Sequence, residues 1–510
     1  MRQFAHALSP GILNAPIRTC PTLIDCNARI APMPNHFRAL LVWALLLLLL
    51  IGGAASAAEL PQSVTRVLTQ RKIPLEALSL MVQAVDEDTP RLALNIDVPR
   101  NPASTEKLIT TWTALDLFGP THTWPTRIYA LGPLRDGVLQ GDLLIKGFGD
   151  PYLVLEDFWK MLGELRRMGV RDIKGRLLID DSHFATDESD ATAFDGQAFR
   201  LYNTLPSALM VNFQSVEFVI DPDAARGRVD ISTIPDLPNL EITNNIKLIP
   251  GECRGNAPQI TMAQAGPTTP DHLVFGGTMP FSCRHFRIAR SVMTPESYAY
   301  GTFKTLWRQW GGTLEGGVER ARVPPGKPPL LTWHSRHLGE ILPPLNKWSN
   351  NLMTRMLLYA IGESRYPPPV TRLQGRDALR EHLAARGLDT SALVVDNGSG
   401  LSRDSRVTAR FMLSLLRLAW SEPTMPEFIA SLSIVGRDGT TRRRFRKGEE
   451  SGRMHLKTGS LEKVSAVSGY VHTPGGRTFM VSMMLNYRGA NWGIGTEIQD
   501  ALLAWTYRLE

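Results

Sequence analysis

The spacing of hydrophobic positions changes twice along the chain. Between residues 59 and about 120, Leu108, Trp112 and Leu115 recur on one helical face and Gly119 follows them, which predicts a helix that ends at the glycine. The next two hundred residues contain short apolar or alternating runs between Gly, Asp and Pro turns, which predict strands. The clearest runs are 127–131, 138–145, 216–220 and 229–234, and the only helix expected among them covers 157–169.

Helical spacing returns after a Pro- and Gly-rich stretch at residues 323–330, which predicts a linker. Helices are expected at 351–362, 376–386 and 496–508, and a β-hairpin at 464–471 and 478–485. This order indicates one α/β domain that a strand-rich insertion interrupts, because an insertion is tolerated where its ends lie close together on a surface. We therefore divide the chain into a first domain part (58–125), the insertion (126–334) and a second domain part (335–510).

The first 57 residues have the pattern of a secretory signal peptide. An apolar run at residues 39–51 is followed by small residues that include Ala55 and Ala57, the pattern of a cleavage site. A membrane-spanning helix needs about 20 apolar residues, so this run is short for one. An uncleaved membrane anchor stays open as the alternative. The 38 residues before the apolar run are unusually many for a leader, which suggests that translation starts at Met33.

Composition and charge indicate a globular protein with an ordinary surface once the predicted leader is removed. A chain of 510 residues with 43% hydrophobic and 21% charged residues is globular, which excludes disordered and collagen-like classes. The leader holds four arginines and one aspartate, so its removal lowers the formal charge from +7 to +4. That is an ordinary surface charge, and no nucleic-acid partner is indicated. Cleavage of the leader would also remove Cys20 and Cys26, which leaves Cys253 and Cys283. We predict a disulfide between these two cysteines, because disulfides persist in the oxidising compartment of an exported protein.

Three short motifs carry the candidate chemistry: Ser104-Thr-Glu-Lys107, Ser349-Asn-Asn351 and Lys457-Thr-Gly459. Ser104 and Lys107 lie one helical turn apart at the start of the predicted helix, within reach of each other. The same S-x-x-K spacing recurs from Ser460 to Lys463, where no helix is expected. Each serine also has a structural interpretation, since Ser104 and Ser349 could simply cap helices.

A serine hydroxyl becomes a good nucleophile only when a base takes its proton. Lys107 can be that base only when neutral, which requires its pKa to fall by about 3 units from a reference near 10.4, or about 4 kcal/mol. Burial and the nearby cation Lys457 would lower the pKa in this way. Ser349 would then relay protons to the leaving amine, and Asn351 would hold a substrate amide.

These motifs are the three active-site motifs of penicillin-binding proteins and serine β-lactamases. Their order, and the gap of about 240 residues between the first two, resemble the class C low-molecular-mass penicillin-binding proteins, the D-alanyl-D-alanine carboxypeptidase/endopeptidase family. Further segments agree, and the resemblance covers essentially the whole mature chain. It implies a transpeptidase-like antiparallel sheet with flanking helices, interrupted by the insertion. The agreeing segments are 101–110, 147–153, 398–403, 436–440 and 457–461.

The resemblance also implies a role for each motif residue. Ser104 would form an acyl-enzyme with Lys107 as base, while Ser349 and Asn351 handle protons and the substrate backbone. The Lys457-Thr458-Gly459-Ser460 segment would bind the substrate, with the carboxylate held by Lys457 and Thr458. The oxyanion hole would consist of the backbone N–H groups of Ser104 and Ser460.

Family members recognise the diaminopimelate side chain through an aspartate in the insertion and an arginine further on. Arg403 matches the arginine and Asp195 is the nearest match to the aspartate, although only Phe194 remains of the Trp-rich context that is usual there. Members often have a neutral residue at the position of Glu462, so the side-chain preference of this chain stays open.

The implied function is that of a periplasmic serine DD-peptidase acting on peptidoglycan stem peptides, with β-lactams as covalent inhibitors. No cofactor or metal is expected, because His334 and His337 lack the glutamate and spacing of a zinc protease. Two alternatives stay open: a serine β-lactamase, although no E-x-x-L-N segment supplies a deacylating glutamate, and a peptidoglycan-binding or scaffold module with little turnover.

Overall fold

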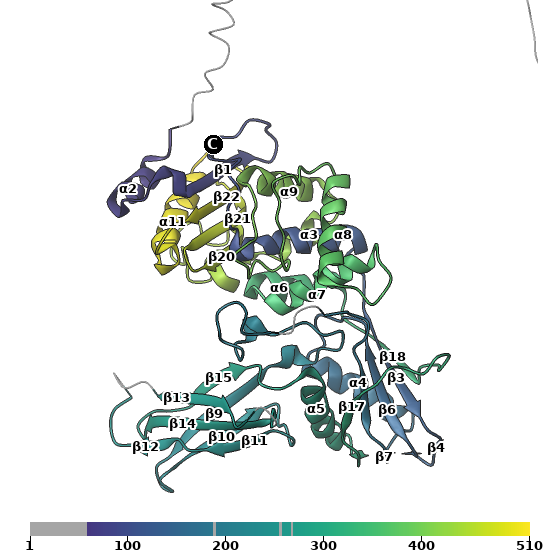
Figure 1. Cartoon of the computed structure of the whole chain (residues 1–510). Helices are drawn as coiled ribbons and strands as arrows, with labels where there is room; N and C mark the ends of the chain where they lie inside the picture. Colours follow the sequence, from purple (N-terminus) through teal and green to yellow (C-terminus); the bar gives the residue numbers. More distant parts are fainter. Residues whose placement is uncertain (1–58, 187–189, 254–257, 267–268) are drawn as a thin grey trace, which may run out of the picture. The chain divides into compact units, whose positions relative to one another are not determined.

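A six-stranded antiparallel sheet joins the two ends of the described chain. The computed structural model describes residues 59–186, 190–253, 258–266 and 269–510 (Figure 1). Strand β1 pairs with β22, which places Leu80 opposite Met483. The strand order is β19-β20-β21-β22-β1-β2 and every neighbouring pair is antiparallel. The strands are β1 Leu78–Ala84, β2 Leu92–Leu94, β19 Ser433–Ile434, β20 Met454–Leu461, β21 Val464–His472 and β22 Thr478–Asn486.

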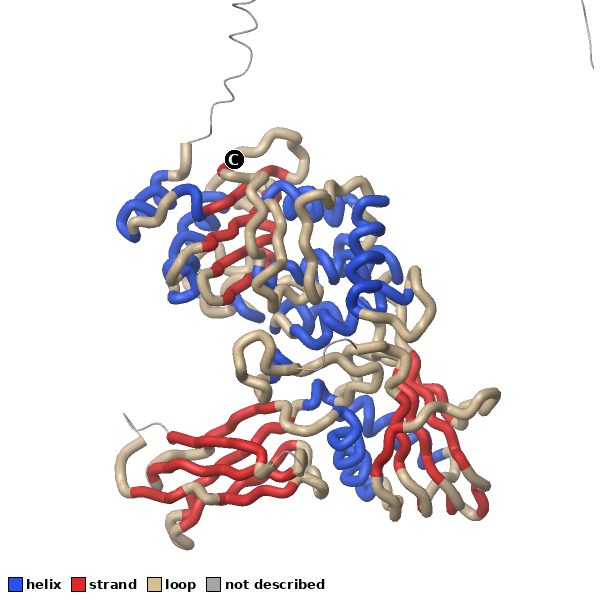
Figure 2. The backbone as a smooth tube through the Cα atoms, viewed as in Figure 1, coloured by secondary structure: helices blue, strands red, loops and turns tan. Residues whose placement is uncertain are grey.

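Helices cover both faces of this sheet, because its central strands are apolar on both sides (Figure 2). In β1, Leu80 and Val82 belong to the core on one face, and Met81 belongs to the core on the other. The first face packs against α2 Gln62–Arg71 and α11 Ile494–Tyr507. The second packs against α3 Lys107–Phe118, α6 Leu338–Trp348, α7 Asn351–Glu363, α8 Arg372–Ala385, α9 Ala409–Ser421 and α10 Met425–Ala430. The predicted α/β fold class is confirmed.

The described residues between 125 and 334 form further sheets around a separate apolar core. One sheet has the order β17-β8-β6-β3-β18 and another β16-β7-β5-β4. A third has the order β10-β9-β15, and the fourth has β14 between β11 and β12 with β13 also paired to β14. The domain boundaries at 125 and 334 stay a prediction. The strands are β3 Pro125–Leu131, β4 Leu134–Arg135, β5 Val138–Leu139, β6 Asp142–Gly147, β7 Asp172–Ile173, β8 Leu177–Asp180, β9 Val216–Asp223, β10 Arg228–Ile234, β11 Glu241–Asn244, β12 Lys247–Ile249, β13 Gln259–Gln264, β14 His272–Pro280, β15 Phe286–Arg290, β16 Thr313–Leu314, β17 Val318–Arg320 and β18 Leu331–His334.

The prediction of a single helix in this region is wrong. Helix α4 covers Leu155–Arg167, close to the expected 157–169, but a second helix, α5, covers Pro295–Gln309. Thr294 caps α5 through its side chain and Pro295 occupies the first turn, which is a favoured helix start. The aromatic and threonine residues of α5 are typical of strands, and many of them are buried against the insertion core.

The predicted disulfide between Cys253 and Cys283 is present and joins the segment after β12 to the segment after β14. The predicted leader, the start at Met33, Cys20 and Cys26 lie outside the described residues. Among the residues that are described, no helix is long and apolar enough to cross a membrane.

Candidate active site

Ser104 and Lys107 lie where a short 3-10 helix leads into α3. The 3-10 helix covers Ala103–Glu106, and Lys107 is the first residue of α3. Ala103 has a positive φ of 44°, a conformation that non-glycine residues rarely adopt. Lys107 is completely buried, and its Nζ lies 3.2 Å from Ser104 Oγ. The predicted serine and lysine are therefore in direct contact.

Two carbonyl oxygens complete the surroundings of Lys107. Its Nζ donates to Asn351 Oδ1 at 2.6 Å and to the backbone carbonyl of Ser399. A neutral amine has two N–H groups and one lone pair, whereas an ammonium has three N–H groups. In the charged form, Lys107 donates to the two carbonyls and to Ser104 Oγ. In the neutral form, the two carbonyls accept both N–H groups and the lone pair faces the hydroxyl of Ser104, which is the form that a general base requires.

Both polar atoms of the Asn351 side-chain amide form hydrogen bonds. Its Oδ1 accepts from Lys107, and its Nδ2 donates to the carbonyl of Tyr202 at 3.2 Å. Tyr202 belongs to a 3-10 helix at Leu201–Asn203 within the insertion. Asn351 therefore orients the base and links α7 to the insertion.

Ser349 and Lys457 form the second half of the site. Ser349 connects α6 to α7 in a left-handed conformation with φ 59°. Lys457 is completely buried in β20, and its Nζ donates to Ser349 Oγ at 2.9 Å and to the carbonyl of Thr458 at 2.8 Å. Thr458 is partly exposed, and its hydroxyl bonds to that of Thr440 at 2.8 Å. Lys457 thus connects β20 to Ser349, and Thr458 connects β20 to Thr440.

Two glycines allow these segments to close around the serine. A Cβ on Gly459 would lie 2.6 Å from the carbonyl oxygen of Pro102 and 2.9 Å from the backbone nitrogen of Ser104, so only glycine fits there. Gly400 has φ 74°, and a Cβ there would collide with the backbone of Ala103. Strand β20 and the 398–402 segment therefore approach the backbone of residues 102–105 closely. Ser460, which follows Gly459, is exposed.

The electrostatics of the site favour a neutral Lys107. Burial lowers its pKa well below the usual value, and the charges of Lys457 and Arg355 lower it further, while Glu106 opposes them. Arg355 lies on α7 one turn after Asn351 and is 7% exposed. Burial also lowers the pKa of Lys457, to about 7. Lys107 is thus the amine better suited to accept a proton, and Lys457 the better suited to remain a cation.

Glu106, inside the first motif, is an unexpected feature of the site. It is 1% exposed, and neither carboxylate oxygen makes a full hydrogen bond within the described residues. Burial raises its pKa to about 7, Asp396 raises it further, and Ser405, Lys107 and the N–H of Gly400 act in the opposite direction. A carboxyl group in this environment is largely protonated below neutral pH.

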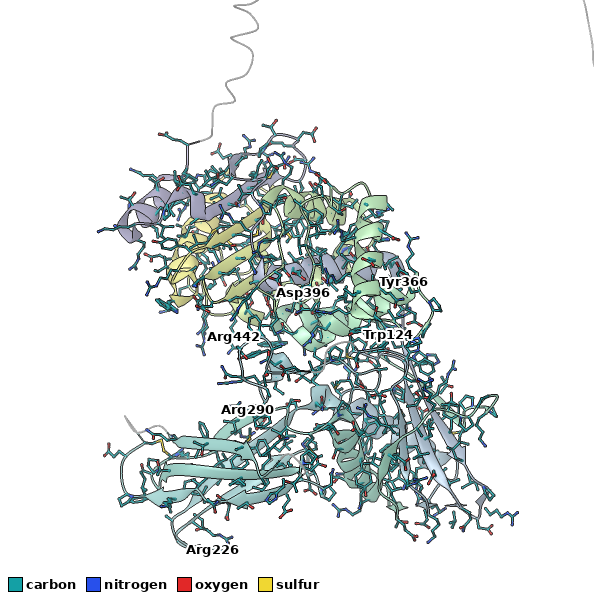
Figure 3. The ribbon with its side chains drawn as sticks, viewed as in Figure 1. Trp124, Arg226, Arg290, Tyr366, Asp396 and Arg442 are labelled. Atoms are coloured by element: carbon teal, nitrogen blue, oxygen red, sulfur yellow. A yellow bond between two sulfur atoms is a disulfide. The ribbon has the colours of Figure 1, made fainter. Side chains whose placement is uncertain are left out.

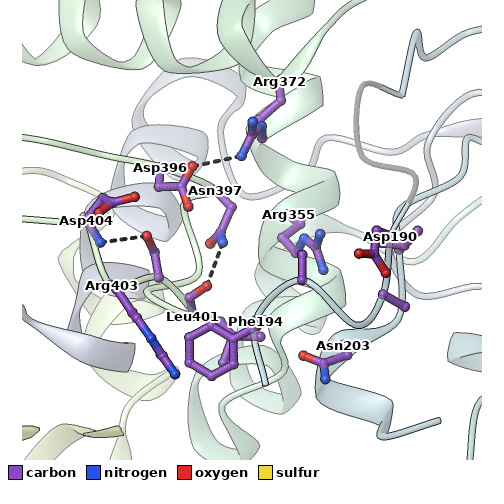
Figure 4. A pocket seen from close by; sticks show the side chains of 14 residues that line it. Asp190, Phe194, Asn203, Arg355, Arg372, Asp396, Asn397, Leu401, Arg403 and Asp404 are labelled. Atoms are coloured by element: carbon purple, nitrogen blue, oxygen red, sulfur yellow. Dashed lines mark hydrogen bonds and ion pairs between the residues drawn. The ribbon is translucent and has the colours of Figure 1, made fainter. Parts of the chain in front are cut away.

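A cavity of about 450 Å³ lies between the insertion and the segment after α8 (Figure 4). Arg403 lies at one side of it, with its Cζ 4.9 Å from the centroid of the Phe194 ring. Arg355 and Asp190 lie further along (Figure 4). The lining residues are Asp190, Ala191, Ala193, Phe194, Asn203, Leu205, Arg355, Arg372, Asp396, Asn397, Leu401, Ser402, Arg403 and Asp404.

Asp195 is not among the described residues that line this cavity. Its carboxylate accepts from Tyr202 Oη at 2.7 Å, from Asn203 Nδ2 at 2.8 Å and from the backbone N–H of Gln197 at 3.1 Å. These bonds hold the loop of the insertion together. Asp190 is the carboxylate of this loop that lies at the cavity. Glu462 lines a neighbouring cavity of about 490 Å³, together with Arg403.

Spacing and motif order singled out most of this site but missed several participants. Ser399, Thr440 and Glu106 contact or flank the motif residues, and each lies inside a segment noted in the sequence. Only the fold shows that a backbone carbonyl of Ser399 reaches Lys107. Among the described residues, no three His, Cys, Asp or Glu side chains are grouped as a metal ion requires, so we name no metal ligands.

Comparisons with known proteins show which family the chain resembles. The profile of the D-Ala-D-Ala carboxypeptidase 3 (S13) family matches residues 60–509. A D-alanyl-D-alanine carboxypeptidase of an Actinomadura species is 30% identical over 418 residues, 79% of this chain and 76% of that protein. Penicillin-binding protein 4 of Haemophilus influenzae has the same fold, with a TM-score of 0.72 at 21% identity over 88% of this chain and 99% of that one. A predatory endopeptidase of Bdellovibrio bacteriovorus aligns with a TM-score of 0.52 at 15% identity over 84% and 92% of the two chains.

The close approach of Gly459 to Ser104 predicts that Gly459→Ala lowers turnover by at least ~100-fold, because the added methyl group displaces the nucleophile. Steady-state hydrolysis of a D-Ala-D-Ala peptide measures the loss, and circular dichroism confirms folding. Gly475→Ala is the matched control, since a Cβ there meets only Thr473 Oγ1 at 3.9 Å. Activity of Gly459→Ala equal to that of this control would contradict the packing described.

Glu106 predicts a pH-dependent stability difference between the wild type and Glu106→Gln. The folded protein keeps the Glu106 proton up to about pH 7, whereas the unfolded chain loses it near 4.5, the ordinary pKa of a glutamate. The free energy of unfolding of the wild type should therefore fall relative to the variant as pH rises through this window, by about 3 kcal/mol in total. Urea unfolding from pH 4 to pH 8 measures it, with the exposed Glu462→Gln as control. A constant difference across this range would show that Glu106 is not protonated.

Proposed function

Because this chain belongs to the D-Ala-D-Ala carboxypeptidase 3 (S13) family, we propose that it is an exported serine DD-peptidase of peptidoglycan stem peptides. Family membership supports the carboxypeptidase activity. The serine mechanism rests on one observation above all: Lys107 is buried, directs two N–H groups to carbonyl oxygens and lies 3.2 Å from Ser104 Oγ. A buried lysine held in this way is suited to accept the proton of the serine hydroxyl.

Acylation begins when the substrate carboxylate binds Lys457 and Thr458. Ser104 Oγ attacks the scissile carbonyl carbon, and its proton passes to Lys107. The oxyanion that forms accepts hydrogen bonds from the backbone N–H groups of Ser104 and Ser460. Gly459 supports this step, since its contact with the Ser104 backbone brings β20 next to the nucleophile.

The leaving amine then needs a proton. Lys457 donates a hydrogen bond to Ser349 Oγ at 2.9 Å, which leaves the Ser349 hydroxyl hydrogen free to point toward that amine. Ser349 gives its hydroxyl proton to the leaving amine. Lys107, which took the proton of Ser104, then gives that proton to Ser349 and returns to the neutral state. Water next attacks the acyl-enzyme with Lys107 as base again, which releases the shortened peptide and restores Ser104.

The same site can serve two reactions. A terminal D-Ala and the D-centre of a cross-linked diaminopimelate both place a free carboxylate next to the scissile amide. One cationic pocket at Lys457 therefore suits both D-Ala-D-Ala carboxypeptidase and D-Ala-diaminopimelate endopeptidase substrates. On the acyl side we assign the diaminopimelate side chain to the cavity at Arg403, with Asp190 as the carboxylate near it. Asp195 is assigned to shaping the loop, because three protein donors already occupy its carboxylate.

Export to the periplasm completes the proposal. The signal-peptide pattern of residues 1–57 supports it, and the disulfide between Cys253 and Cys283 is a bond that persists in oxidising compartments. β-Lactams carry a carboxylate near a reactive amide, as the peptide substrate does, so we expect them to acylate Ser104.

Labelled penicillin tests the proposal. Fluorescent penicillin should label the wild type covalently, and the label should be released slowly. The Ser104→Ala variant should not be labelled. The Ser63→Ala variant, changed on the exposed side of α2, should be labelled as the wild type is. Denaturing electrophoresis over time measures both labelling and release. Rapid release as hydrolysed drug would instead indicate a β-lactamase, and the absence of labelling in the wild type would favour a peptidoglycan-binding module.

A further inference from the structure

One surface lies beyond Thr458, next to the residues assigned to the reaction. In the proposed function, the acyl part of the substrate extends from Ser104 toward the cavity at Arg403, and the carboxylate of the leaving group binds Lys457 and Thr458. A hydrogen bond of 2.8 Å joins Thr458 to Thr440 there. Thr440 ends the Gly436–Thr440 segment, one of the segments noted in the sequence that the proposed reaction does not use.

Trp348 and Arg442 form the surface next to this segment. Trp348 directly precedes Ser349 and is 59% exposed, which is unusual for the largest apolar side chain. Arg442, two residues after Thr440, lies with its Cζ 5.7 Å from the centroid of the Trp348 ring and is itself exposed (Figure 3). The guanidinium group of Arg442 thus lies against the indole ring of Trp348, and both side chains are exposed to solvent.

This surface is held in place before any ligand arrives. Lys347, the neighbour of Trp348, forms an ion pair of 2.6 Å with Asp438, and its backbone carbonyl accepts from Ser433 Oγ at 3.4 Å. These contacts join the end of α6 to the 436–441 segment. The backbone next to Trp348 is therefore held against the 436–441 segment before a ligand arrives, which reduces the ordering free energy lost on binding.

The charge on this surface is also available for a ligand. Arg444, two residues after Arg442, pairs with Asp500. Arg442 and Arg443, by contrast, form no ion pair with any part of the chain that the structure describes, and both are exposed. An anionic group that arrives on this side would meet unpaired guanidinium groups, which bind carboxylates well.

We propose that Trp348 and Arg442 form a subsite for the acceptor stem of a peptidoglycan cross-link, an aliphatic and anionic peptide that leaves in the endopeptidase reaction. The inference rests on the proposed function and identifies its leaving-group specificity. The methylene chain of the leaving diaminopimelate lies across the indole of Trp348, and a carboxylate of the attached stem pairs with Arg442. A leaving D-Ala has only a methyl side chain and ends before this surface.

Two substrates with the same acyl part test the subsite. One is a pentapeptide that ends in D-Ala-D-Ala, and the other is a cross-linked dimer whose leaving group is a complete stem. Trp348→Ala and Arg442→Gln should each lower kcat/KM for the dimer by about tenfold or more and change kcat/KM for the pentapeptide by less than about twofold. Added NaCl should lower the dimer rate of the wild type more than that of Arg442→Gln, because salt screens an exposed ion pair.

Trp492→Ala is the matched control, since Trp492 is 72% exposed and directly follows Asn491, whose side chain accepts a hydrogen bond from the backbone of Lys463 rather than from the 436–440 segment. Equal losses on both substrates, or unchanged dimer hydrolysis in both variants, would overturn the subsite. A wild type that cleaves the pentapeptide but not the dimer would also overturn it and leave the proposed carboxypeptidase intact. A wild type that cleaves neither substrate and binds no penicillin would overturn both.

Discussion

The burial of two lysines in one small site is the constraint on which the rest of this structure depends. Lys107 and Lys457 are each completely buried, and two buried cations so close to each other are unfavourable. The site resolves this by giving the two amines different surroundings. Lys107 faces two carbonyl oxygens and a hydroxyl, while Lys457 contacts one hydroxyl and the carbonyl of its neighbour. The first arrangement suits a neutral base, and the second leaves a cation with an N–H group for an anionic substrate.

The fold brings these amines together from distant parts of the chain. Lys107 begins a helix on one face of the six-stranded sheet, and Lys457 lies within β20 of the same sheet. Backbone-to-backbone contact at Gly459 and Gly400 removes the space that side chains would occupy between the segments. The insertion contributes as well, since the carbonyl of Tyr202 holds the amide of Asn351. The base is therefore oriented by elements from both the sheet domain and the insertion, which connects substrate recognition to the chemistry.

Much of this arrangement could be predicted from sequence patterns, and the elements and contacts that could not be predicted have physical explanations. Helical spacing predicted α3 and α7, and motif order predicted that Ser104, Lys107, Ser349 and Lys457 meet. Helix α6 was missed because Pro343 and Pro344 lie inside it, and α5 because its composition resembles a strand. Asp195 matched a family position, but its neighbours Tyr202 and Asn203 occupy its carboxylate. Side-chain pairing of this kind depends on tertiary packing, which neither periodicity nor spacing records.

The pH dependence of acylation tests the central claim most directly. The pre-steady-state burst with a chromogenic β-lactam at saturating concentration isolates the acylation rate, while the carboxylate of the β-lactam stays paired with Lys457. The account predicts that this rate rises with pH and levels off well below the usual lysine pKa, because burial and Lys457 lower the pKa of Lys107. In Lys457→Ala the inflection should move to higher pH, and in the exposed Lys463→Ala it should not move. An inflection near 10.5, the ordinary pKa of a lysine, would show that Lys107 is not the neutral base, as would an inflection that Lys457→Ala leaves unchanged.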